Sequence, residues 1–108
     1  MMDSSIFTLC EKHDHSAILQ LAHKDHPIFQ AHFENNPLLP GFLQLDIIAS
    51  VFAKVVTEII SAKFIHPVLP DTTLYYTLKN DKNERITIKL YDKENIMISN
   101  FRVKWSNA

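Results

Sequence analysis

The sequence predicts an α+β domain in which an antiparallel sheet wraps around one long central helix. Three observations predict it: short strand-like apolar segments occupy both ends of the chain, a long segment with helical periodicity lies between them, and that segment is apolar around most of its girth. A helix that is apolar on nearly every side needs other structure around it. Because only a curved sheet covers a single helix so fully, the order of segments favours an α+β layer arrangement.

The first two strands are predicted at 6–12 and 16–22, where apolar runs flank the polar triplet 13–15. Such a short polar break is typical of a turn between antiparallel strands. Residues 23–40 contain three prolines and no clean periodicity, so we expect a long loop there. Ordered loops of this length usually carry functional residues.

The central helix is predicted from Gly41 to about Lys63, because apolar side chains recur there at helical spacing. Its polar residues, among them Asp46 and Ser50, fall on one narrow face. After the helix, strands are predicted at 74–79, 86–91 and 97–105, separated by short polar turns. This spacing indicates an antiparallel meander.

The composition limits the classes of function. A chain of 108 residues is expected to form one domain, residues 1–108. Its 46% hydrophobic and 21% charged residues are typical of a soluble globular protein. A net charge of −1 argues against a nucleic-acid-binding protein. The lone Cys10 allows no internal disulfide, and the histidine spacing fits no zinc site. We therefore expect no metal and no other cofactor.

The sequence also bears on location. No run approaches the roughly 18 consecutive apolar residues of a membrane span. The first residues lack the basic start and the apolar stretch of a signal peptide. We therefore expect a cytoplasmic protein with no membrane span.

The segment 26–46 places a histidine, a glycine and an acid at a fixed spacing. His32 precedes Asp46 by fourteen residues, and Gly41, the only glycine, precedes it by five. This pattern resembles the active-site segment of the 3-hydroxyacyl-(acyl carrier protein) dehydratases, roughly Gly-His-Phe-Pro-Gly-x-Pro-x-Met-Pro-Gly-x-Leu-x-x-(Glu or Asp). A second stretch, KFIHPVLP at 63–70, is similar to the Lys-Phe-x-x-Pro-Val-x-Pro of that family. The positions of the first motif that match in register are His32, Phe33, Pro37, Pro40, Gly41, Leu43 and Asp46.

The resemblance implies a hot-dog fold, usually a dimer whose active site lies between the subunits. His32 would come from one chain and Asp46 from the other, and the partner would be a second copy or a related hot-dog subunit. The implied activity is removal of water from a 3-hydroxyacyl thioester, carried by an acyl carrier protein, to give the trans-2-enoyl thioester. The pathway would be fatty-acid or polyene-type lipid biosynthesis.

The chemistry of dehydration gives each residue a role. A base poised near neutral pH must take the α-proton, which suits His32. The leaving hydroxyl needs a proton donor, which suits an Asp46 kept protonated by apolar neighbours such as Phe42, Leu45 and Ile47. Negative charge grows on the thioester oxygen, where the backbone N–H of Gly41 at a helix N-terminus would stabilise it.

The acyl chain is expected in an apolar tunnel beside the helix. The residues expected to bind it are Phe33, Leu39, Pro40 and Phe42.

Two other functions remain open at this point. A thioesterase of the same fold would use an acid to direct water at the thioester carbonyl, although the spacing from His32 to Asp46 disfavours it. A non-catalytic subunit would bind acyl chains or complete the site of another dehydratase in a heterodimer.

Overall fold

A computed structural model describes residues 6–32 and 39–108, with the side chains of 6–29 and 39–108. The described residues form one six-stranded antiparallel sheet and two helices. The strand order across the sheet is β1-β2-β4-β5-β6-β3, which leaves β1 and β3 at its edges. The helices are α1 (Pro27–His32) and α2 (Gly41–Val51). The strands are β1 (Phe7–His13), β2 (Ser16–Leu21), β3 (Lys54–Phe64), β4 (Thr73–Asn80), β5 (Arg85–Tyr91) and β6 (Met97–Asn107).

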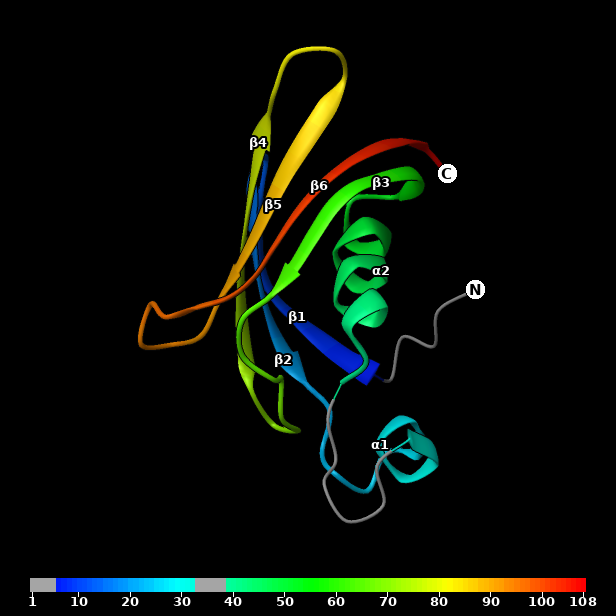
Figure 1. The fold of residues 1–108 in the computed structure, drawn as a ribbon. Helices are drawn as coiled ribbons and strands as arrows, with labels where there is room; N and C mark the ends of the chain where they lie inside the picture. Colours follow the sequence, from blue (N-terminus) through cyan, green and yellow to red (C-terminus); the bar gives the residue numbers. More distant parts are fainter. Residues whose placement is uncertain (1–5, 33–38) are drawn as a thin grey trace.

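The sheet curves, and α2 lies along its concave side beside β3 (Figure 1). Leu45 and Ile48 of α2 are buried in the same core as apolar side chains of the sheet. Burial of this apolar area is the main force that holds the helix on the sheet. The strand side chains at the centre of this core are Leu19, Leu21, Leu74, Tyr76, Ile88, Leu90, Phe101 and Val103.

The five strands predicted outside the central segment are confirmed, with ends within a few residues of the predicted ones. The turns between the strands contain no glycine, and Asp71, Asn83 and Asn95 adopt the positive φ angles that tight turns require. Asp and Asn tolerate this conformation better than most residues, since their short polar side chains bond locally to the backbone.

The prediction of a helix to about Lys63 is wrong, because α2 ends at Val51 and residues 54–64 form β3. Apolar pairs at 55–56 and 59–60 fit a helix by spacing alone. These positions are nevertheless valine and isoleucine, whose branched side chains favour strands. Ala53, with φ of 53°, turns the chain out of the helix. The pairing of β3 along β6 then decides the conformation.

The prediction of an uninterrupted loop at 23–40 is also wrong, because it contains α1. Pro27 is the first helical residue, where its missing N–H costs nothing and its φ suits the helix. The Nδ1 atom of His26 accepts a hydrogen bond from the N–H of Ile28 at 3.1 Å, and Phe29 is fully buried. These contacts hold the short helix in place before the segment that leads to α2.

One side of α2 is not covered by the residues that the structure describes. Asp46 and Ser50 are exposed, and Phe42 is 63% exposed. The neighbouring edge strand β3 also exposes Val55 and Ile59. The helix was expected to be enclosed on nearly every side, but the described residues enclose it on the sheet side only.

Candidate active site

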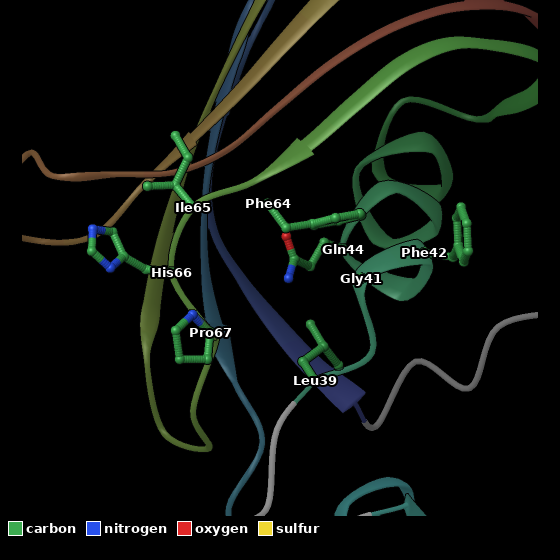
Figure 2. Close-up of a pocket in the computed structure, with 8 residues that line it drawn as sticks. All are labelled: Leu39, Gly41, Phe42, Gln44, Phe64, Ile65, His66 and Pro67. Atoms are coloured by element: carbon green, nitrogen blue, oxygen red, sulfur yellow. The ribbon is translucent and has the colours of Figure 1, made fainter.

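A pocket of about 420 Å³ lies at the N-terminus of α2. One wall is the segment at the start of α2 and the other is the segment that follows β3. Figure 2 shows these two segments facing each other. Its lining is mostly apolar, as is usual for small-molecule sites. The residues that line it are Leu39, Gly41, Phe42, Gln44, Phe64, Ile65, His66 and Pro67.

Backbone hydrogen bonds hold the two walls in place. The N–H of Leu39 donates to the carbonyl of Val68 at 2.9 Å, which ties the segment before α2 to the segment after β3. The N–H groups of Ile65 and His66 donate to the carbonyl of Ile98 on β6 at 2.8 and 3.1 Å. The two matched sequence motifs thus meet in space and form the pocket together.

Gly41 is the first residue of α2 and is preceded by Pro40, which makes no side-chain cap. The N–H groups of a first helical turn lack partners within the helix and carry its positive dipole end. A Cβ at Gly41 would lie 2.6 Å from the Cε1 and Cζ atoms of Phe64. The Phe64 ring is in turn in edge contact with Phe101, with ring centroids 5.5 Å apart. Glycine therefore lets this ring lie directly against the start of the helix.

Gln44 is a pocket residue that the sequence reasoning missed. It is 3% exposed, and its Oε1 is buried with no hydrogen-bond partner in the described part of the chain. The hydroxyl of Tyr76 donates to the backbone carbonyl of Gln44 at 2.6 Å. Burial raises the pKa of Tyr76 far above its ordinary value, so this hydroxyl keeps its proton. The signal that could have identified Gln44 is its position as a polar residue on the side of the helix that faces the sheet.

Of the residues predicted to bind substrate, Leu39 and Phe42 line the pocket, together with the predicted oxyanion residue Gly41. Pro40 stands at the helix start and is not among the lining residues. Phe33 lies outside the described residues. His32 is the last residue of α1, and its side chain is also outside the described part.

Asp46 does not share the pocket with Gly41 in one chain. It is exposed and lines two clefts between α2 and β3, one with Leu43 and Val56 and the other with Phe42 and Glu58. Of the apolar neighbours expected around Asp46, Phe42 and Leu45 line one of these clefts with it and Ile47 is buried in the core, but among the described residues Asp46 itself stays exposed.

No group of three or more His, Cys, Asp or Glu side chains in the described ranges is arranged to hold a metal ion. None of the described helices has the length and apolar character needed to cross a membrane.

A curved antiparallel sheet with a helix on its concave side defines the hot-dog class, and solved structures share it. A chain of the dehydratase heterocomplex ApeI:P from Xenorhabdus doucetiae matches with a TM-score of 0.73 and 24% identity, over 97% of this chain and 100% of that one. Mouse thioesterase superfamily member 2 matches with a TM-score of 0.62 and 14% identity, over 91% of this chain and 79% of that one. These likenesses show the fold.

The chain belongs to the ApeI-like family, described as ApeI dehydratase, whose profile matches residues 9–102. The 3-hydroxyacyl-(acyl carrier protein) dehydratase FabZ of Fusobacterium nucleatum is 34% identical over an alignment of 76 positions, which takes in 60% of this chain and 54% of the relative. The chain thus spans about half the length of that curated relative.

Proposed function

We propose that this protein is a dehydratase that removes water from a 3-hydroxyacyl thioester to give the 2-enoyl thioester. The observation that carries the proposal is the pocket at the N-terminus of α2, where the two motifs of the dehydratase pattern form opposite walls. Membership of a dehydratase family supports the same reaction.

In this proposal three groups of the chain perform the chemistry. His32 takes the proton from the α-carbon, and the electron pair of that C–H bond forms the C2–C3 double bond. The C3–O bond breaks, and Asp46 gives its proton to the leaving hydroxyl, which departs as water. The N–H of Gly41 stabilises the negative charge on the thioester oxygen. Exchange of protons with solvent returns His32 and Asp46 to their starting forms.

The active unit we propose is a dimer in which Asp46 of one subunit completes the site of the other. Exposed apolar side chains beside Asp46 support it: Phe42 on α2, and Val55 and Ile59 on β3. β3 is also an edge strand whose outer backbone groups have no neighbour in the described sheet. Such an edge favours pairing with another chain. A second copy is the partner we propose, and a related hot-dog subunit is the alternative suggested by the ApeI:P heterocomplex.

The substrate carrier in this proposal is an acyl carrier protein. The proposed pathway is fatty-acid or polyene-type lipid biosynthesis in the cytoplasm, and residues 1–108 act as one domain. The name of the Fusobacterium relative supports the carrier. The carrier is tested by comparing kcat/KM for one acyl group on carrier protein and on coenzyme A. A preference for the coenzyme A thioester would contradict the proposed carrier.

The reaction is tested by following 2-enoyl thioester formation from 3-hydroxyacyl thioesters. We expect His32→Ala and Asp46→Asn each to lower kcat by about 10²–10⁴-fold, the usual contribution of a positioned acid or base. The matched controls are His15→Ala and Glu84→Gln, which remove an exposed histidine and an exposed acid that line neither the pocket nor the Asp46 clefts. Both controls should stay within a few-fold of wild type. Release of free thiol without enoyl product would instead identify a thioesterase.

A further inference from the structure

Gln44 has an unusual position for a buried polar side chain. Its side-chain oxygen is shielded from water and has no hydrogen-bond partner among the described residues. An unpaired buried acceptor is costly, so native structures generally provide a partner for it. The side chain lines a pocket that is otherwise mostly apolar. A ligand in the pocket is therefore a natural source of the missing donor.

The location of Gln44 relative to Gly41 restricts where that donor lies. The two residues are three positions apart on α2, which is a rise of about 4.5 Å along the helix. Side chains of a helix tilt toward its N-terminus, so the Gln44 amide extends back toward the turn that contains Gly41. In Figure 2 this amide lies on the sheet side of α2, between Phe64 and Leu39.

The backbone beneath Gln44 is fixed from the sheet. The Tyr76 hydroxyl donates to the Gln44 carbonyl at 2.6 Å, and Tyr76 is fully buried. A side chain on such an anchored backbone loses little further freedom when it binds a ligand, which favours selective recognition.

We propose that Gln44 positions the substrate by accepting a hydrogen bond from its 3-hydroxyl group. This proposal rests on the proposed function, in which the thioester oxygen binds at Gly41. The 3-hydroxyl is three bonds from the thioester carbon, which suits the short separation between Gly41 and Gln44. The hydroxyl donates its hydrogen to Gln44, so its oxygen lone pairs stay free to take the proton from Asp46.

The arrangement also favours release of product. The 2-enoyl thioester has lost the hydroxyl and has no donor for Gln44. With product bound, the Gln44 oxygen is unpaired and buried again, which weakens binding of product relative to substrate. Gln44 thus selects acyl groups that bear a 3-hydroxyl over those that lack it.

The test measures binding of unreactive ligands by calorimetry. The ligands are two pantetheine amides in which an NH group replaces the thioester sulfur, which makes the α-proton too weakly acidic to be removed. Their equal acyl chains differ only in a 3-hydroxyl. Wild type should bind the 3-hydroxy amide about 5- to 100-fold more tightly than the 3-deoxy amide, the range expected when one buried acceptor gains a donor. Gln44→Met and Gln44→Leu should bind both amides equally.

Ser99→Ala is the matched control, because Ser99 also has a buried oxygen without a partner but does not line the pocket. It should keep the wild-type preference. Equal binding of both amides by wild type, or an undiminished preference in Gln44→Met, would overturn the proposal. Because binding is measured without turnover, the two proposals can fail separately. If the protein dehydrates no 3-hydroxyacyl thioester but Gln44→Met still loses the preference, the proposed function is rejected and the role of Gln44 in ligand selection stands.

Discussion

The start of α2 and the ring of Phe64 are in such close contact that a Cβ on Gly41 would lie 2.6 Å from two ring carbons. Phe64 ends β3 and Gly41 begins α2, so this contact joins the two motifs that the sequence analysis matched separately. The lack of a side chain at Gly41 thus permits the close approach of the ring to the helix N-terminus.

Gly41→Ala should therefore push the Phe64 ring out of place. We expect a loss of about 1–3 kcal/mol in the free energy of unfolding, as for other overpacked sites. In a Phe64→Ala background the same change should cost less than about 0.5 kcal/mol, because no ring is left to displace. A double-mutant cycle by urea denaturation measures this coupling. Equal costs in both backgrounds would mean that the ring is not what excludes a side chain at Gly41.

Tyr76→Phe should cost about 1 kcal/mol of stability near neutral pH, because it removes the buried hydrogen bond to Gln44. The cost should shrink at high pH. Burial raises the pKa of Tyr76 above its ordinary value of 10.0, so above that pH the unfolded chain loses the phenol proton and the folded chain keeps it. Stability then falls with rising pH by up to about 1.4 kcal/mol per unit in wild type.

The Tyr76→Phe protein lacks this source of pH dependence. Denaturation curves at several pH values between 8 and 11 test the sign, with Tyr75→Phe as the control that keeps the wild-type slope. A difference between wild type and Tyr76→Phe that does not change with pH would show that the Tyr76 hydroxyl is open to solvent.

Ile59→Lys should disrupt the proposed dimer and leave a monomer at micromolar concentration. Ile59 lies on the edge strand β3 beside the cleft of Asp46, and a lysine there would have to be buried without a partner. Leu9→Lys, on the opposite edge strand β1, is the control and should stay dimeric. Analytical ultracentrifugation distinguishes the two. If Leu9→Lys were monomeric and Ile59→Lys remained dimeric, the interface would lie at the β1 edge instead.

Ala53→Gly should raise the free energy of unfolding by roughly 0.5–1 kcal/mol. Ala53 has a φ of 53°, which is strained for a residue with a Cβ and unstrained for glycine. Ala62→Gly, within β3 and paired with Phe101 of β6, is the control and should be destabilising. Thermal denaturation measures both, and a loss of stability in Ala53→Gly would mean that the strain is not relieved there.

The junction at Ala53 also shows how far the sequence predicts this fold. The strands before and after the central segment were predictable, because alternating apolar residues and polar turns mark them independently of context. The boundary between α2 and β3 was not, because Val55, Val56, Ile59 and Ile60 have the spacing of a helix but the branched side chains that favour a strand. The turn at Ala53 and the long-range pairing of β3 with β6 decide it.

The candidate site shows the same division. Gly41 and Leu39 were identified because the motif places them at the helix start, and both line the pocket. Gln44 was missed, because its importance comes from burial against the sheet and from an oxygen left without a partner. The exposure of Asp46 was also missed, because it depends on which side of α2 the sheet covers and on what a second subunit would add.

The central claim is that His32 of one subunit acts with Asp46 of the other, and mixed dimers test it most directly. His32→Ala and Asp46→Asn subunits carrying different tags are expressed together, and the doubly tagged dimers are purified and assayed for dehydration. A two-fold symmetric dimer with shared sites should have one intact site of two, and so about half of the wild-type activity, although each parent is inactive. Mixed dimers as inactive as their parents would contradict the claim.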